Sequence, residues 1–196
     1  DEFLGALVRQ MPLLDAEQHG RELYGAVRFS PFDYVDEKET ALSRLVADLL
    51  DPSASHGQGP LFLNAFLRAI GHEEVSRWKP DVTVNCEDSG ENGRIDIMVT
   101  TPRSIIGIEN KPYAPEGDRQ LERYVEEVGK RAGGRQWDVV FLSQQEPETA
   151  KDRVIRMGFV AGSEAPTHLS GVLAGVLGEI KAERFASFVR EFLDWL

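Results

Sequence analysis

The sequence has little cysteine, fewer basic than acidic residues, and no long apolar run. Its one cysteine, Cys86, cannot form an internal disulfide bond, and its four histidines are too widely separated to suggest a Cys/His zinc site. No apolar run approaches the roughly 20 residues of a membrane helix, and the N-terminus lacks the basic and apolar regions of a signal peptide. We therefore expect a cytoplasmic protein, with no membrane association and no structural zinc.

The chain is also short of the features that separate domains. It has 196 residues, of which 41% are hydrophobic, enough to bury one core. It has no internal repeat, low-complexity tract or Pro/Gly/Ser linker, so we expect a single domain over residues 1–196. A start at Asp1 and an amphipathic stretch still running at Leu196 suggest that the chain is a fragment of a longer one.

Positive charge is scarce, because 33 acidic residues against 22 basic ones give a net charge of -11. Proteins that bind nucleic acid usually carry a basic patch or stripe, so this balance argues against a plain nucleic-acid binder. A metal site built from carboxylates would change the argument, because a bound divalent cation inverts the local charge and attracts phosphate. Net charge alone leaves a nucleic-acid partner open.

Periodicity predicts early helices, three strands, a helix, a fourth strand and C-terminal helices. The expected helices cover residues 1–14, a stretch from Asp36 to Asp51, residues 60–70, residues 118–130 and most of 169–196. The expected strands are residues 81–87, 94–100, 105–109 and 137–143.

The turn Thr101 to Ser104 fixes a register between the second and third strands. A symmetric four-residue turn makes the numbers of paired residues sum to 205, which places Asp96 opposite Glu109. Directly opposed residues have Cβ atoms roughly 4.5 to 5.5 Å apart, so the two carboxylates can bind one cation together. Lys111 lies two residues after Glu109 and shares its face.

The same alternation divides the hairpin into a charged face and an apolar face. The charged face holds Asp96, Glu109 and Lys111. The apolar face holds Ile95, Ile97, Val99, Ile106 and Ile108. We expect the apolar face to pack on the core and the charged residues to point away from it, into a site.

These residue types suit hydrolysis of a phosphodiester, which needs an activated water and relief of charge in the transition state. Mg²⁺ or Mn²⁺ can provide both, and such ions are held by one or two carboxylates plus water and substrate oxygens. Asp96 and Glu109 would supply the carboxylates. Lys111 would orient the attacking water or stabilise developing negative charge, so we expect it to be the catalytic lysine.

Glu-x-Lys by itself is a weak signal, because Glu179-Ile180-Lys181 repeats it inside an expected helix. The literal Pro80-Asp81 pair is also misleading, since Asp81 opens the first strand and has no hairpin relation to Glu109. Two alternatives to a catalytic site stay open: a surface hairpin with an ordinary exposed face, and an acidic interaction protein whose carboxylates are merely solvated.

Four ordered blocks together resemble the PD-(D/E)XK nucleases, and more narrowly their RecB-like branch and related uncharacterised bacterial proteins. Gly93-Arg94-Ile95-Asp96 is similar to the branch's Gly-x-x-Asp, and Glu109-Asn110-Lys111 to its Glu-x-Lys. Gln120-Leu121-Glu122-Arg123-Tyr124 looks like its Gln-x-x-x-Tyr helix, and Glu39 resembles its upstream helical glutamate. The resemblance covers residues 39–143.

The resemblance implies an α/β fold with a restriction-endonuclease-like core, in which helices flank a central four-stranded mixed sheet in the order αβββαβ, with extra helices at both termini. It also implies that Glu39, Asp96, Glu109 and the carbonyl of Asn110 bind the metal. Gln120 and Tyr124, four residues apart on one helix face, would approach substrate or support the site. Glu39 as a first-turn capping residue and Tyr124 as a core residue are the competing interpretations.

We therefore expect a metal-dependent nuclease that acts on nucleic acid, with DNA as the favoured substrate. The alternative is a nuclease-derived module that binds nucleic acid or protein without cutting, since a fold does not guarantee an activity. His56 lies in a glycine-flanked loop and is expected to be structural or exposed. Sequence leaves open DNA versus RNA, endonuclease versus exonuclease action, and the oligomeric state.

Overall fold

The computed structural model describes Phe32 and residues 39–77, 81–90, 93–112, 119–145, 152–161 and 167–196. The chain divides into two units, residues 1–35 and residues 36–196, and every element named below belongs to the second. The helix expected over residues 1–14 and the cap expected at Asp36 lie outside the described residues. The same holds for the side chain of Glu39, whose backbone begins a helix.

A mixed sheet of five strands, in the order β1-β2-β3-β4-β5, forms the centre of this unit. Its strands are β1 (Thr83–Gly90), β2 (Gly93–Thr100), β3 (Ser104–Lys111), β4 (Gln136–Ser143) and β5 (Val154–Met157). The two hairpin contacts β1/β2 and β2/β3 are antiparallel, whereas β3/β4 and β4/β5 are parallel. The mixed sheet was predicted but its fifth strand was not, because four residues are too short a run to show a period.

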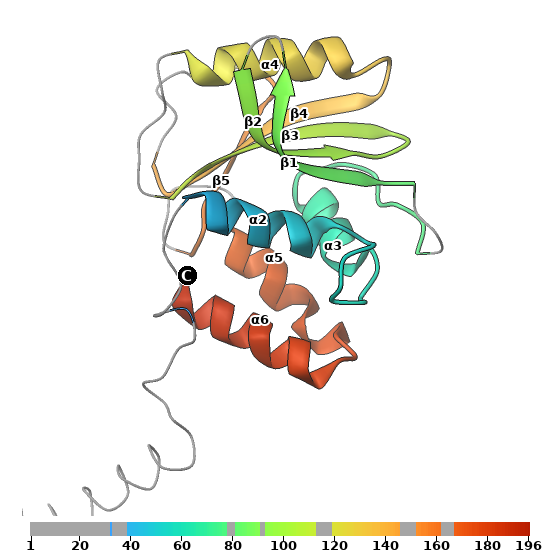
Figure 1. The fold of residues 1–196 in the computed structure, drawn as a ribbon, viewed down its shortest axis with the longest axis vertical. Helices are drawn as coiled ribbons and strands as arrows, with labels where there is room; N and C mark the ends of the chain where they lie inside the picture. Colours follow the sequence, from blue (N-terminus) through green and yellow to red (C-terminus); the bar gives the residue numbers. More distant parts are fainter. Residues whose placement is uncertain are drawn as a thin grey trace, which may run out of the picture. The chain divides into compact units, whose positions relative to one another are not determined.

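Helices cover both faces of this sheet (Figure 1). They are α2 (Glu39–Leu50), α3 (Leu61–Ala69), α4 (Gln120–Arg131), α5 (Leu169–Val176), the 3-10 turn η2 (Leu177–Glu179) and α6 (Glu183–Trp195). In Figure 1, α4 lies on one side of the sheet and α2, α5 and α6 lie on the other. The chain therefore has the α/β fold with a restriction-endonuclease-like core that the sequence predicted.

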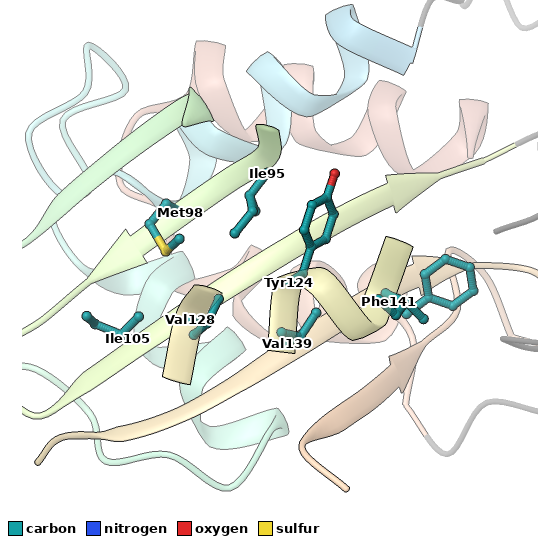
Figure 2. Packing of buried hydrophobic residues seen from close by; sticks show 8 residues of the cluster. Ile95, Met98, Ile105, Tyr124, Val128, Val139 and Phe141 are labelled. Carbon is teal, nitrogen blue, oxygen red and sulfur yellow. The ribbon is translucent and has the colours of Figure 1, made fainter. Parts of the chain in front are cut away.

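The core beneath α4 is a cluster of apolar side chains from three strands and one helix (Figure 2). Its members are Ile95, Met98, Ile105, Leu121, Tyr124, Val128, Val139 and Phe141. Helix α4 approaches β3 so closely that a Cβ added at Gly107 would lie 2.8 Å from Cγ2 of Val128. Glycine at position 107 therefore allows α4 to pack directly on the strand that ends in Glu109.

The face opposite α4 is equally apolar, and this corrects the expected division into one core face and one charged face that holds the site. Four of the five predicted core residues lie there and are fully buried: Ile97, Val99, Ile106 and Ile108. The fifth, Ile95, joins the α4 cluster with Met98, three residues along β2 (Figure 2). The period of two is therefore broken between Ile95 and Met98, and sheets with parallel strands are commonly covered on both faces.

The predicted register of the β2–β3 hairpin is confirmed. Ile97 pairs with Ile108, and the pairs continue to Thr100 with Ile105, so the paired numbers sum to 205. The turn is closed by Thr101, whose side-chain oxygen accepts a hydrogen bond from the Ser104 N–H at 2.8 Å. The ladder ends with the pair Ile97 and Ile108, so the neighbouring residues Asp96 and Glu109 do not belong to it.

The C-terminal part is mostly helical, as predicted, but the second Glu-x-Lys copy is not inside a helix. Glu179 ends η2, and the next two residues belong to the link before α6. Within the described ranges, no helix is both long and apolar enough to cross a membrane.

Candidate metal and catalytic site

Residues from β2, β3 and α4 meet where β3 ends and α4 begins. The backbone N–H of Asn110 donates to Oδ2 of Asp96 at 2.9 Å, which joins the end of β3 to β2. The side-chain amide of Gln120 donates to Oε1 of Glu109 at 2.6 Å, which joins the end of β3 to α4. The structure therefore brings together candidates that are up to 24 residues apart in the sequence.

Asp96 stands at the point where the alternation of β2 breaks. Because the regular ladder has ended at Ile97, the Asn110 N–H is bonded to a side-chain carboxylate. A hydrogen bond from a backbone N–H to a carboxylate is stronger than one between neutral groups and is directional. It holds the Asp96 carboxylate directly beside the Glu109-Asn110-Lys111 segment.

Glu109 is buried, with only 1% of its surface exposed. Its Oε1 atom lies 3.1 Å from Nζ of Lys111 and 2.6 Å from Nε2 of Gln120. A buried carboxylate is costly unless it is paired and hydrogen-bonded, and these two donors offset much of that cost. The alternation placed the charged trio away from the core, whereas Glu109 lies buried on the face that α4 covers, next to the apolar cluster.

The first turn of α4 connects both carboxylate-bearing strands. The Gln120 amide also donates to the Tyr124 hydroxyl at 2.8 Å, and that hydroxyl donates to the backbone carbonyl of Arg94 in β2. The Tyr124 ring belongs to the apolar cluster, while its hydroxyl joins the site. Both interpretations of Tyr124 therefore describe part of the same side chain.

The hydroxyl of Tyr124 is a donor throughout the neutral pH range. Burial raises its pKa to about 12, and the nearby negative charges of Glu109 and Asp96 act in the same direction. The hydrogen bond from Gln120 acts in the opposite direction but is outweighed. The protonated hydroxyl can therefore keep its bond to the Arg94 carbonyl.

Asn110 faces the other side of the sheet, away from α4. Its side-chain amide donates to the hydroxyl of Ser43 in α2 at 2.9 Å, and both residues are buried. Helix α2 begins at Glu39, four residues before Ser43. Sequence reasoning missed Ser43, although a small polar residue beside Leu42 on an apolar helix stripe was a usable signal.

Residues set aside from the site are placed elsewhere by the structure. His56 is buried in the loop after α2, where its Nδ1 atom accepts a hydrogen bond from the Gln58 N–H at 3.0 Å. Its ring packs against Phe62 and Phe185, so His56 has a structural setting. Asp81 is exposed and precedes β1, two residues before the strand begins.

The donor set suits a small oxygen-preferring cation. Across the described ranges, no three His, Cys, Asp or Glu side chains gather closely enough to form a metal cage of their own. Mg²⁺ and similar ions do not need one, because they are commonly held by one or two carboxylates with water and substrate oxygens completing the shell. Asp96 and Glu109, joined through Asn110, fit that requirement.

One of three comparisons with known proteins found a match. A family model described as the PD-(D/E)XK nuclease superfamily matches residues 29–158, which include the strands and helices that build the site. Searches of curated proteins and of solved structures returned no match. The match spans well over half of the chain and carries with it both carboxylates and the lysine, so this chain belongs to the PD-(D/E)XK nuclease superfamily.

Proposed function

We propose that this chain is a Mg²⁺- or Mn²⁺-dependent nuclease that hydrolyses phosphodiester bonds in DNA. The observation that carries the proposal is the Glu109 carboxylate, held between Lys111 and Gln120, beside an Asp96 carboxylate bonded to Asn110. Membership of the nuclease superfamily supports the same reaction class. The contact of Gln120 with Glu109 further supports a place in the RecB-like branch, whose Gln-x-x-x-Tyr spacing the helix matches.

The carboxylates of Asp96 and Glu109, with the Asn110 carbonyl and Glu39, are proposed to hold the metal. A bound divalent cation lowers the pKa of its water and neutralises charge on the phosphate. Gln120 restricts the rotation of the Glu109 carboxylate, which keeps one oxygen oriented before any ion arrives.

Lys111 is proposed to act on the reacting phosphate. Only 16% of its side chain is exposed, so its ammonium group is partly shielded from water. Partial desolvation strengthens its interaction with charge that develops in the transition state, a contribution typically worth about 10² to 10³ in rate. Its ion pair with Glu109 keeps the ammonium group within the site while substrate is absent.

The acidic composition is compatible with this function. A net charge of -11 repels a polyanion at long range. A divalent cation bound between the two carboxylates cancels their negative charge and places a cation at the point where the scissile phosphate must lie. We therefore propose that metal and nucleic acid bind cooperatively, in contrast to a basic protein that binds nucleic acid without metal.

The test is cleavage of linear duplex, circular duplex and single-stranded DNA, and of RNA, with Mg²⁺, Mn²⁺, Ca²⁺ or EDTA. We expect DNA cleavage with Mg²⁺ or Mn²⁺, none in EDTA, and none from Asp96→Asn under any condition. Asp81→Asn is the matched control, since it removes an exposed carboxylate away from the site and should cleave normally. Cleavage of the circular substrate would identify endonuclease action.

Two results would contradict the proposal. Binding of nucleic acid without cleavage under every condition would identify a non-cleaving module derived from a nuclease. Equal cleavage by Asp96→Asn and the unaltered chain would remove Asp96 from the site.

A further inference from the structure

The middle residue of Glu109-Asn110-Lys111 makes a contact that the proposed chemistry does not use. Glu109 lies on the side covered by α4, whereas Asn110 points to the opposite side and is completely buried. Its amide Nδ2 lies 2.9 Å from Oγ of Ser43, which is itself only 3% exposed. A polar contact enclosed on both sides has no water to replace it, so its geometry is set by the protein alone.

Ser43 is also tied to the sheet through its backbone. The thiol of Cys86 in β1 lies 3.8 Å from the Ser43 carbonyl oxygen. Helix α2 is thereby attached through one residue to an outer strand and to the strand that ends in the site. Helix α2 begins at Glu39, four residues before Ser43.

We propose that Ser43 is a positioning residue for the metal site, acting through the side chain of Asn110. This inference rests on the proposed function, in which Asp96 and Glu109 hold a divalent cation. Anchoring the Asn110 side chain fixes the backbone whose N–H binds the Asp96 carboxylate. It also fixes how far the first turn of α2 reaches toward that end of β3.

The physical reason for a hydroxyl at position 43 is that Asn110 binds Asp96 through its backbone and Ser43 through its side chain. If Ser43 is replaced by alanine, the Asn110 amide loses this acceptor in a site closed to water, which favours a shift of the side chain and its backbone. A shift of a fraction of an ångström would misplace the two carboxylates relative to one another. Removing supporting residues of this kind usually weakens metal binding about 10-fold to 100-fold.

The experiment is calorimetric titration of Mn²⁺ into the full chain without nucleic acid, together with the melting temperature in EDTA. We expect Ser43→Ala to raise the Mn²⁺ dissociation constant about 10-fold, near the lower limit for such residues. Asn110→Ala removes the same hydrogen bond by deleting its donor, so it should raise the dissociation constant by a similar factor. If Ser43→Ala does not fold, Asn110→Ala replaces it in the test. The double variant should bind Mn²⁺ less weakly than the two single effects combined would predict, because both substitutions remove the same hydrogen bond.

Cys86→Ala is the matched control, since it removes a contact to the Ser43 carbonyl and leaves the Ser43 hydroxyl in place. It should change the Mn²⁺ dissociation constant less than about 2-fold, well below the effect of a lost supporting residue. A Ser43→Ala chain that melts at a lower temperature yet binds Mn²⁺ normally would overturn the inference and leave Ser43 a packing residue. Failure of the unaltered chain to bind Mn²⁺ would overturn the proposed metal-dependent function itself.

Discussion

At the scale of single residues, the two candidate metal ligands occupy different environments. Asp96 is partly exposed and accepts a backbone hydrogen bond, whereas Glu109 is buried between a lysine and an amide. Loss of charge at these two positions should therefore have similar effects on metal binding but different effects on folding.

We expect both Asp96→Asn and Glu109→Gln to abolish cleavage, with only the second markedly destabilising the metal-free protein. Asparagine at position 96 keeps an oxygen that can accept the Asn110 N–H, so its cost should stay below about 1 kcal/mol. Glutamine at position 109 leaves the Lys111 ammonium partly buried without its carboxylate, which should cost about 1 to 3 kcal/mol. Urea unfolding in EDTA measures both, and equal stabilities would show that the Glu109–Lys111 pair contributes little.

A second prediction separates catalysis by Lys111 from binding, because lysine to methionine keeps the apolar stem and removes the charge. Lys111→Met should lower the single-turnover cleavage rate by roughly 10² or more while metal affinity is retained. Lys181→Met, in the second Glu-x-Lys copy, is the control and should cleave normally. A near-normal rate at saturating DNA, with weakened binding and a reduced salt slope, would instead make Lys111 a phosphate-binding residue.

At the scale of secondary-structure elements, the first turn of α4 is the part that joins the two strands of the site. Gln120 contacts Glu109 of β3, and Tyr124 contacts the Arg94 carbonyl of β2. Arg94 lies two residues before Asp96, just ahead of the break in alternation. The hydroxyl of Tyr124 thus holds β2 just before its alternation breaks.

Tyr124→Phe should reduce cleavage while preserving the ring packing, and its stability should respond differently to alkaline pH. The Tyr124 pKa of about 12 exceeds the ordinary value of 10.0, so the folded state keeps its proton where the unfolded state loses it. The contribution of Tyr124 to stability is therefore complete below about pH 10 and falls as the pH rises toward 12. The difference in unfolding free energy between the unaltered chain and Tyr124→Phe should be smaller at pH 11 than at pH 9. An equal difference at both pH values would contradict this.

Close packing of α4 on β3 gives a fourth prediction. Gly107→Ala would place a Cβ 2.8 Å from the Val128 side chain, so it should destabilise the fold by about 1 to 3 kcal/mol. Gly171 in α5 is the matched control, because a Cβ there meets nothing within 4 Å. Gly171→Ala should stabilise the chain by about 0.5 to 1 kcal/mol, as expected for alanine in a helix. Urea unfolding that ranks the two variants in the opposite order would refute the packing argument.

At the scale of the whole molecule, a net charge of -11 makes the folded state respond to cations. Ion binding to the native state alone should raise stability by about 1.4 kcal/mol at ten times the dissociation constant. For a chain of this size the melting temperature should rise by about 3 to 6 °C. Asp96→Asn should lose this rise in Mn²⁺, whereas an equal rise in both chains would indicate diffuse screening of surface charge.

The sequence alone determined the features that depend on neighbouring residues. The four-residue turn set the pairing sum of 205, because register in a hairpin follows from turn length. The α/β order followed from the periods of the apolar residues. The prediction that grouped Asp96 with Glu109 and Lys111 used only that register and the alternation of a strand, although the ladder itself ends at Ile97 and Ile108.

Only the tertiary structure decided which residues enclose the site. Alternation distinguishes the two faces of a strand but does not predict whether helices cover one face of the sheet or both. The burial of Glu109 under α4 was therefore not predictable. The place of Ile95 beneath α4 depends on a local break in β2, and the Ser43–Asn110 bond joins residues 67 positions apart. Such contacts are fixed by packing between distant elements, because no local pattern records which helix will cover which face of the sheet.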